Sequence, residues 1–246
     1  MTTPSGRLGV IDRISRIAKS FIEGLTLSVG SKETRFASIN LDIDAQVKPD
    51  VVGDARSLPF RSEAFSLIYF TDVIEHIPKE DEMRALNEIH RILKSCGILI
   101  FSTPNHRKLF TFLDPAYYLI NHRHYTTEAV KSLLENAGFR IIKLFTAGGI
   151  WACIATLWYC IVTYPINKVF KRNLPYVPSF ISHKTNKEYG LYTESSGYTI
   201  FTVQLNHVKK TFSYGNHTLY NSEKTLLLCL ESIKRQTTKT IKVMVR

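Results

Sequence analysis

Three residues in the first quarter of the chain have side chains and positions suited to binding a nucleoside. Gly30, Asp42 and Asp54 each close a short run of β-type residues. Ligands of doubly wound α/β sheets bind outside the carboxyl ends of the strands. A glycine there lets a ligand approach the backbone, and a carboxylate can accept both hydroxyls of a ribose, as expected of Asp42, or an adenine amino group, as expected of Asp54. The alternative for an aspartate at a strand end is a turn or cap former.

The elements that must position these residues follow an alternating pattern. From residue 25 to 145, short β-type runs alternate with segments of helical periodicity, which is typical of βα units and a largely parallel sheet. We expect strands at 25–29, 38–41, 50–52, 65–70, 98–102, 139–145 and 198–205. Helices are expected at 79–94 and after the capping residue Thr126, the second ending at Gly138.

The stretch VVGDARSLPFRSEAFSLIYFTDVIEHIPKEDEMRALNEIHRILKSCGILIFSTPN resembles the central block of small-molecule-type, Rossmann-like (class I) methyltransferases. The shared pattern is a GDA-LPF segment, a strand, an EH-I turn, a helix ending in R-x-LK-x-x-G and a strand ending in PN. HRHYTTEAVKSLLENAGFRIIKL resembles the helix and strand that follow, so the resemblance covers about residues 25–145, with 198–205 as the last strand. It implies an α/β fold: a Rossmann-like, doubly wound, mostly parallel sheet with helices on both faces, a shortened first βα unit, an antiparallel last strand and an apolar helical insertion before it.

The resemblance also implies a cofactor, S-adenosylmethionine, and a set of residues around it. It places Gly30 at the methionine end, Asp42 at the ribose and Asp54 at the adenine. The turn formed by Phe70, Thr71 and Asp72 would lie beside the cofactor, and His76 near the substrate.

The connection after Gly30 departs from the family's pattern. Only eight residues, Ser31 to Ser38, precede the second strand, whereas a parallel crossover ordinarily needs a dozen or more. We therefore expect the first helix to be missing or reduced to one turn. This shortening disfavours a dinucleotide, whose phosphates need a glycine-rich loop, more than it disfavours S-adenosylmethionine. The carboxylate of that cofactor can be met by backbone N–H groups after Gly30 or by Lys32.

Methyl transfer from a sulfonium is an in-line displacement, so the protein must position the acceptor and remove its proton. His76 is the candidate catalytic base, because imidazole titrates near neutrality; the alternative is a histidine that only hydrogen-bonds locally. His122, His124 and Tyr125 could line the substrate side, or the two histidines could be structural.

Composition limits the class of protein. The 246 residues, 44% of them hydrophobic, are enough to bury a full core. The net charge of +11 comes from the rear, where 13 Lys and Arg face four Asp and Glu after residue 150. The four cysteines form no C-x-x-C pair, so no metal site or disulfide framework is predicted and a cytoplasmic location is expected.

Residues 1–24 form a predicted amphipathic helix rather than a signal peptide, since charged residues interrupt its apolar ones. The apolar positions Val10, Ile14, Ile17, Phe21 and Leu25 keep helical spacing. We expect this helix to pack on the methyltransferase-like domain, predicted at 25–207; docking on a membrane is the alternative.

An apolar insertion is expected at 144–196. Twenty-four uncharged residues lie between Lys143 and Lys168, a length that suits a transmembrane helix. A single crossing conflicts with strands on both sides belonging to one sheet. The two favoured alternatives are an in-plane or re-entrant membrane helix, with Trp151, Trp158 and Tyr159 at the interface, and a cap over the substrate pocket.

The last segment, 208–246, is expected to be an appendage. Residues 220–246 resemble the opening of a family-two glycosyltransferase, cut off before any acidic nucleotide-sugar residue. This fragment cannot form a sugar-transferase site, although it hints at a glycan-building context.

These observations predict a methyltransferase acting on a hydroxyl or carboxyl of a small molecule, glycan or lipid-linked saccharide, near the inner face of a membrane. The alternative is a catalytically inactive, membrane-associated interaction module. A nucleic-acid partner is disfavoured, because the basic residues are interspersed with apolar ones rather than gathered on one aromatic-studded face.

Overall fold

The computed structural model describes residues 5–19, 23–30, 37–114, 117–118, 122–171, 174–175, 177–194 and 196–206. Its strands are β1 (Thr26–Val29), β2 (Ile39–Asp42), β3 (Val51–Val52), β4 (Phe65–Thr71), β5 (Leu93–Pro104), β6 (Phe139–Ala147), β7 (Tyr192–Thr193) and β8 (Thr199–Asn206). Its helices are α1 (Ser5–Lys19), α2 (Glu82–Ile92), α3 (Lys108–Phe112), α5 (Thr127–Asn136), α6 (Ile150–Trp158), α7 (Tyr164–Phe170) and α8 (Ser179–Tyr189). Short 3-10 turns are η1 (Ala45–Val47), η2 (Ile74–His76) and η3 (Lys79–Asp81), and a π-helix, η4 (Tyr159–Thr163), joins α6 to α7.

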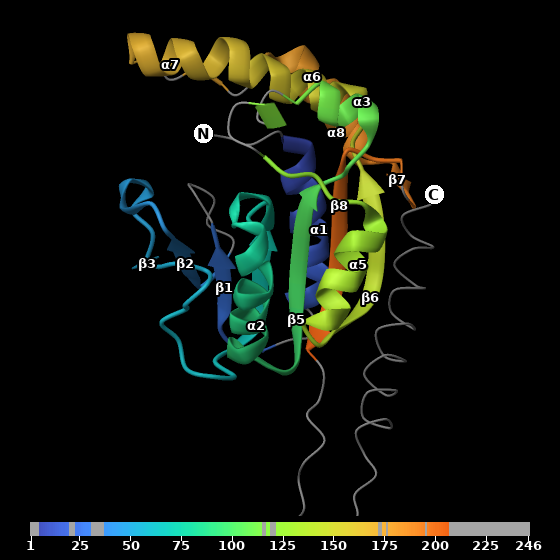
Figure 1. The fold of residues 1–246 in the computed structure, drawn as a ribbon. Helices are drawn as coiled ribbons and strands as arrows, with labels where there is room; N and C mark the ends of the chain where they lie inside the picture. The colour runs from blue at the N-terminus through green and yellow to red at the C-terminus, as the bar shows by residue number, and fades with distance from the viewer. Residues whose placement is uncertain are drawn as a thin grey trace, which may run out of the picture. The chain divides into compact units, whose positions relative to one another are not determined.

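The described strands form one mixed sheet in the order β3-β2-β1-β4-β5-β8-β6-β7. Pairing from β3 to β5 is parallel, and β8 is antiparallel to both β5 and β6. The strand order reverses between β1 and β4, which is the point where doubly wound sheets bind ligands. Figure 1 shows the carboxyl ends of the parallel strands at the same edge of the sheet. The predicted Rossmann-like fold with an antiparallel last strand is confirmed.

Helices cover both faces of the sheet, as expected. α2 and α5 lie on the face seen in Figure 1, where Leu86, Ile89 and Leu134 are fully buried in the main hydrophobic core. α5 begins where the sequence predicted, because the Thr126 hydroxyl accepts a hydrogen bond from the backbone N–H of Ala129 at 3.1 Å. β5 is longer than expected and begins at Leu93, which already pairs with Phe65 before a register shift.

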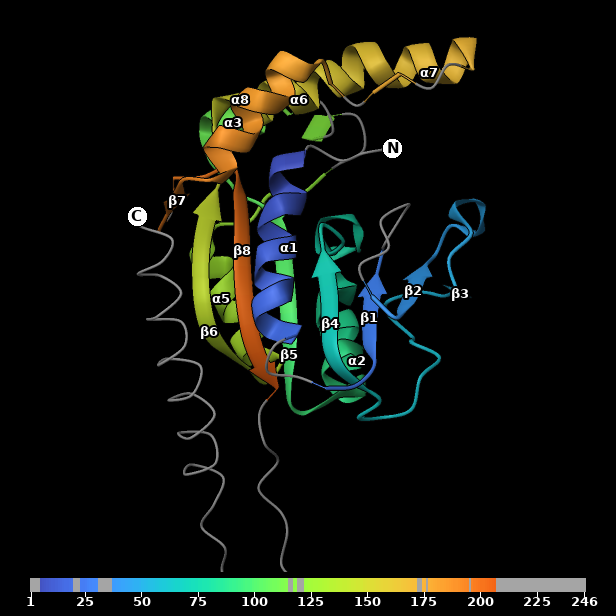
Figure 2. The ribbon, with the colours of Figure 1, turned by 180° about the vertical axis from the view of Figure 1, so that it is seen from behind.

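The N-terminal helix α1 packs on the opposite face of the sheet, seen in Figure 2, against β5 and α8. Its buried stripe is Val10, Ile11, Ser15 and Ala18, whereas Ile14 and Ile17 are only partly buried. The expected helix is therefore present, but it is rotated from the predicted face because the small residues Ser15 and Ala18 allow close contact with the sheet. Leu25 lies outside the helix, and Phe21 lies outside the described residues.

The apolar insertion lies beyond the carboxyl edge of the parallel strands (Figures 1 and 2). α6 packs on α8, where Ala155 and Ile181 are buried together with Val177 from the residues just before α8. Glu188 of α8 caps the start of α6, since its carboxylate accepts hydrogen bonds from the N–H groups of Gly149, Trp151 and Ala152 at 2.9, 3.0 and 3.1 Å. These contacts join the first and last helices of the insertion, and α8 in turn packs on α1.

Two expectations fall on parts of the chain that are not described. Residues 31–36, where the first helix was expected to be lost, lie outside the described residues, and so does Lys32. The same holds for the appendage at 208–246 and its resemblance to a glycosyltransferase opening.

Candidate cofactor pocket and neighbouring histidine cluster

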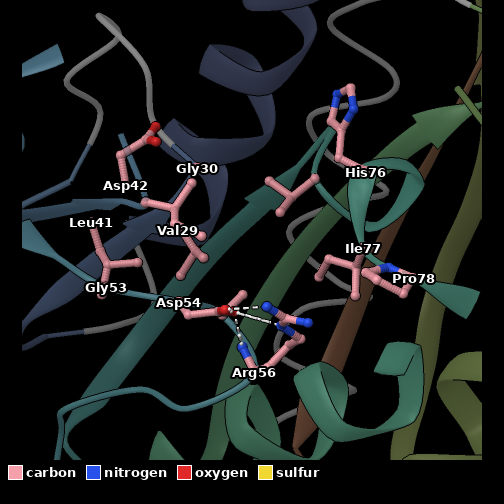
Figure 3. A pocket seen from close by; sticks show the side chains of 13 residues that line it. Val29, Gly30, Leu41, Asp42, Gly53, Asp54, Arg56, His76, Ile77 and Pro78 are labelled. Carbon is pink, nitrogen blue, oxygen red and sulfur yellow. Dashed lines mark hydrogen bonds and ion pairs between the residues drawn. The ribbon is translucent and has the colours of Figure 1, made fainter. Parts of the chain in front are cut away.

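A pocket of about 150 Å³ opens at the carboxyl ends of β1, β2 and β3. It is lined by Val29, Gly30, Leu41, Asp42, Ile43, Gly53, Asp54, Ala55, Arg56, Val73, His76, Ile77 and Pro78. Figure 3 shows Asp42 and Gly30 on one side and His76, Ile77 and Pro78 on the other. Small-molecule sites typically start at roughly 300 Å³, so the described residues enclose part of a cofactor-sized site. The segment that follows Gly30 directly is not described.

Gly30 is placed as the sequence predicted, and the structure shows why a glycine is needed. Its φ of +69° lies in the left-handed region, and its N–H donates to the carbonyl of Leu41 at 2.8 Å. A Cβ at this position would lie 2.4 Å from Cγ2 of Val73. The absence of a side chain therefore keeps the cradle between β1 and the turn after β4 open.

Asp42 ends β2 and also lines the pocket, in agreement with its predicted position. It is 6% exposed, and its Oδ1 accepts a hydrogen bond from the N–H of Asp44 at 3.0 Å. A carboxylate held this way at the wall of a pocket can accept further hydrogen bonds from a diol. The position is consistent with contact to a ribose.

Asp54 reaches the same pocket, but its carboxylate is already engaged by Arg56. Its oxygens accept hydrogen bonds from the Arg56 N–H at 2.8 Å, from Nε at 3.0 and 3.1 Å and from Nη2 at 2.6 Å (Figure 3). Arg56 also donates to Asp81 at 2.7 Å. The hydrogen bonds from Arg56 hold the pKa of Asp54 below its ordinary value. An adenine amino group would have to displace one of these hydrogen bonds. The sequence did not predict this contact between Arg56 and Asp54.

The turn after β4 contributes a different residue from those predicted. Phe70 is fully buried in the core, and neither it nor Thr71 or Asp72 lines the pocket; Val73 does. Asp72 forms an ion pair with Arg7 of α1, with Nη1 and Oδ2 3.0 Å apart. Burial raises the pKa of Asp72, although Arg7 opposes the shift. Val73 places this turn beside the pocket, while cofactor contacts of Phe70, Thr71 and Asp72 themselves remain a prediction; the Phe70 side chain lies in the core, and Asp72 is paired with the N-terminal helix.

His76 lies at the pocket rim at the end of η2 and is exposed. The η2 turn is held by Arg123, whose Nη2 donates to the carbonyl of Ile74 at 2.7 Å and to that of Ile77. Arg123 also pairs with Glu82 at 3.1 Å. The predicted base is thus at the pocket, on a turn fixed by a residue that the sequence analysis did not single out.

Two further histidines extend the site away from the pocket. The His122 ring lies 4.8 Å from the ring of His76, centroid to centroid. Asp114 Oδ2 lies 3.1 Å from Nδ1 of His122 and 2.8 Å from Nε2 of His124. Neither His122 nor His124 lines the pocket itself, so a role at the substrate remains a prediction. His122 adjoins the pocket through its contact with His76.

The charges in this cluster determine the protonation of His122. Glu75 Oε1 lies 3.6 Å from Nε2 of His122. Burial alone would lower the pKa of His122, but the hydrogen bond to Asp114 and the charge of Glu75 raise it to about 9. Burial alone would raise the pKa values of Glu75 and Asp114. The neighbouring His122 instead lowers the pKa of each carboxyl, and His124 lowers that of Asp114 further. At neutral pH this arrangement makes His122 an imidazolium, so it is unsuited to act as a base.

Tyr125 does not line the described pocket, so a role on the substrate side remains a prediction. Its hydroxyl donates to Glu82 Oε1 at 2.8 Å, and its ring lies under the Arg123 guanidinium, 5.7 Å from the ring centre. Burial and the neighbouring Glu82 carboxylate raise the pKa of Tyr125. These contacts support the η2 turn.

Replacing Tyr125 by phenylalanine is expected to lower the free energy of unfolding by about 1.5–3 kcal/mol, because Glu82 is buried and loses a hydrogen bond to a charged group. Cofactor affinity should not change. Urea denaturation and calorimetric titration measure the two quantities, with the exposed Tyr118→Phe as the matched control. A loss of cofactor affinity without a loss of stability would contradict this assignment.

Asp114 is the residue that sequence reasoning missed altogether. It precedes His122 and His124 by eight and ten residues, a spacing that corresponds to neither helical nor strand periodicity. Glu75 is 2% exposed and faces His122. Only the folded chain brings these groups together.

The fold and the pocket together define a class of protein. A 3-2-1-4-5 parallel half with an antiparallel strand beside β5 is the Rossmann-like fold of class I methyltransferases, and the pocket lies at its switch point. Residues 29–101 match the family model described as a methyltransferase domain, which spans β1 to β5 and includes every residue that lines the pocket.

Solved structures share this fold. A S-adenosylmethionine-dependent methyltransferase from Thermotoga maritima, described as a possible histamine N-methyltransferase, is 18% identical with a TM-score of 0.50, covering 78% of this chain and 86% of that one. One from Archaeoglobus fulgidus is 19% identical with a TM-score of 0.51, covering 81% and 94%. The [4+2]-cyclase SpnF is 17% identical with a TM-score of 0.51, covering 79% and 80%. No curated protein matched the sequence.

These findings indicate S-adenosylmethionine as the cofactor. The residues present fit it: a Cβ on Gly30 would fill the cradle, and the Asp42 carboxylate lies at the pocket wall where a ribose needs acceptors. The cyclase among the similar folds shows that the fold does not fix the reaction.

Proposed function

We propose that the protein transfers a methyl group from S-adenosylmethionine to a hydroxyl or carboxyl of a small molecule, glycan or lipid-linked saccharide. The observation that supports this most is that Gly30, Asp42 and His76, from three separate segments, line one pocket at the switch point of the sheet. The first two are suited to holding the cofactor. His76 is exposed, so an acceptor can reach it from solvent.

In this mechanism Asp42 accepts the ribose hydroxyls, and the backbone at Gly30 bounds the methionine part. The cofactor supplies an electrophilic methyl group on a sulfonium. His76 accepts the proton of the acceptor hydroxyl, for which an imidazole is suited near neutral pH. The η2 turn keeps His76 in place, because Arg123 ties its carbonyl groups to Glu82.

A radiolabelled transfer assay against pooled small-molecule, glycan and lipid-linked acceptors tests this proposal. We expect His76→Ala to lower the rate by about 100-fold or more while cofactor affinity changes little, since a positioned base contributes about 10²–10⁴. His183→Ala, an exposed histidine on α8, is the control and should leave the rate unchanged. Cofactor binding without transfer to any acceptor would favour the inactive interaction module.

We further propose that the protein works at an anionic membrane surface, on the cytoplasmic side. By length and composition, the stretch Ile150–Phe170 is long and apolar enough to cross a membrane. Its most apolar 18-residue segment is 22% buried. A single crossing would separate β6 from β8, which pair along their length. An in-plane helix avoids this conflict: Ile161 and Phe170 are 62% and 68% exposed, and Lys168 and Lys171 can meet anionic headgroups.

The double substitution Ile161→Ser and Phe170→Ser is expected to weaken partition into phosphatidylglycerol-containing vesicles by tenfold or more, because burying each side chain contributes about 1.5–3 kcal/mol. Sedimentation with vesicles measures the effect. Leu25→Ser, which removes an exposed apolar side chain just before β1, is the matched control. Equal partition of the double variant and the control would contradict a membrane role for this helix.

A further inference from the structure

Three potential metal ligands meet beside the cofactor pocket. Glu75, His76 and His122 each offer one ligand atom, and these atoms all lie within 4.8 Å of one another. Two of the residues come from the η2 turn, and the third comes from the loop before α5. Three ligands on one ion at about 2.1 Å are up to about 4 Å apart, so the group needs a shift of less than about 1 Å to close. The exposed His76 side chain can supply that shift.

Glu75 presents a buried oxygen toward this group. Its Oε2 accepts a hydrogen bond from the Thr103 hydroxyl at 3.1 Å, whereas its Oε1 has no hydrogen-bond partner among the described residues. Nε2 of His122 forms an ion pair with Oε1 at 3.6 Å, a separation too long for a hydrogen bond. Glu75 is 2% exposed, so an oxygen without a hydrogen bond costs free energy that this long ion pair offsets only in part. A divalent cation between Oε1 and Nε2 would displace the Nε2 proton of the His122 imidazolium and bind both atoms.

His122 is oriented as histidine ligands usually are. Its Nδ1 faces the Asp114 carboxylate at 3.1 Å, which leaves Nε2 directed toward Glu75. Metal-bound histidines almost always donate their second N–H to a carboxylate or carbonyl, which fixes the ring and raises its basicity. Asp114 thus has the place of an outer partner rather than a ligand.

A second group, Asp114, His122 and His124, also brings three ligand atoms together. It is less suited to an ion, because Asp114 Oδ2 already serves both imidazoles at 3.1 and 2.8 Å. The first group has the unsatisfied oxygen, and it includes the residue that reaches the pocket.

We propose that Glu75, His76 and His122 bind a divalent first-row transition metal, of which Zn²⁺ and Mn²⁺ are the best fits to two imidazoles and one carboxylate. Three protein ligands leave coordination positions open, as in catalytic sites. The exposed side of His76 and the pocket that it lines make those positions accessible to an acceptor.

The metal site deepens the proposed function. The catalytic role of the metal rests on that proposed function. A metal held by these residues would lower the pKa of an acceptor hydroxyl bound to it, and the proton would pass to solvent. The acceptor oxygen would then form its bond to the methyl carbon as the carbon–sulfur bond of the donor breaks, leaving S-adenosylhomocysteine. His76 would serve as a ligand in that state, with the metal in place of the imidazole as the activating group.

Calorimetric titration of tag-free, metal-stripped protein with Zn²⁺, Mn²⁺ and Mg²⁺ tests the site without any assay of activity. We expect one Zn²⁺ or Mn²⁺ per chain and much weaker Mg²⁺ binding. Asp114→Asn should weaken Zn²⁺ binding by about 10- to 100-fold, the usual loss for an outer partner, and His76→Ala by at least as much. His183→Ala should bind as the parent does. Bound Co²⁺ should give a visible absorption spectrum that Glu75→Gln changes.

Zn²⁺ binding that is equal in His76→Ala, Glu75→Gln and the parent would overturn the proposal, as would no binding at millimolar Zn²⁺. His76 is exposed, so its variant is expected to remain folded, and thermal denaturation checks this. S-adenosylmethionine binding is measured separately. Metal binding without cofactor binding would contradict the proposed function alone, and cofactor binding without metal binding would contradict only the metal site.

Discussion

Replacing Asp42 by alanine is expected to weaken S-adenosylmethionine binding by about 10- to 150-fold. The carboxylate is buried at the pocket wall, and hydrogen bonds to a charged group are each worth about 1.5–3 kcal/mol. The alanine variant would offer the ribose hydroxyls no charged acceptor on β2. Solvent in the variant pocket would replace the lost hydrogen bonds poorly. Calorimetric titration of the purified full chain measures the change.

Asp44→Ala provides the matched control for this substitution. Asp44 is two residues away and exposed, and its carboxylate accepts a hydrogen bond from the N–H of Gln46 at 2.8 Å at the start of η1. It should lose some local stability and keep its cofactor affinity. If the two variants bound equally well, Asp42 would have no part in the site.

The substitution Gly30→Ala is expected to abolish measurable cofactor binding and to destabilise the fold. The new Cβ would lie 2.4 Å from Cγ2 of Val73, so the turn after β4 would have to move. A non-glycine residue in the left-handed region costs roughly 1–2 kcal/mol in addition. Thermal denaturation and calorimetric titration separate the loss of stability from the loss of binding.

Two variants distinguish steric overlap from general damage. Gly9→Ala adds the same methyl group on α1, where nothing lies within 4 Å of it, and it should raise stability by about 0.5–1 kcal/mol. Val73→Ala combined with Gly30→Ala should recover part of the cofactor affinity, because it removes the overlapping atoms. If the single Gly30→Ala variant bound the cofactor as the parent does, the cofactor would not bind beside Gly30.

The sequence predicted the sheet and its strand-end residues well because that information is local. Alternating β-type and helical runs fix the type of each element, and parallel strands bring their carboxyl ends to one edge. Gly30 and Asp42 therefore came out at one pocket. Thr126 identified the start of α5 because a cap acts on the residues directly after it.

Partners that are distant in sequence were not predictable in the same way. Arg56 is only two residues from Asp54, but its second partner, Asp81, is 25 residues away. Held by both aspartates, Arg56 engages the Asp54 carboxylate that the adenine was expected to contact. Phe70 was placed beside the cofactor, yet its side chain is fully buried in the core. Helical periodicity in α1 gave an apolar stripe, while the face that is buried depends on the shape of the sheet beneath it.

The histidine cluster shows the same limit. The motif that carries His122 and His124 was visible in the sequence, and a role at the substrate was the natural hypothesis. Their shared carboxylate, Asp114, comes from just after α3, and Glu75 reaches His122 from a different segment. Such a convergence depends on tertiary packing and has no period in the sequence.

A crystal structure of the full chain grown with S-adenosylhomocysteine is the most direct measurement of whether the pocket holds the cofactor. We expect the ribose hydroxyls within hydrogen-bonding distance of Asp42, the adenine beside Asp54 and Ala55 with Arg56 moved from its present position, and the sulfur on the side of Gly30 that faces His76. Density for the ligand at another place, or Asp54 still bound by Arg56 as it is without ligand, would contradict the account.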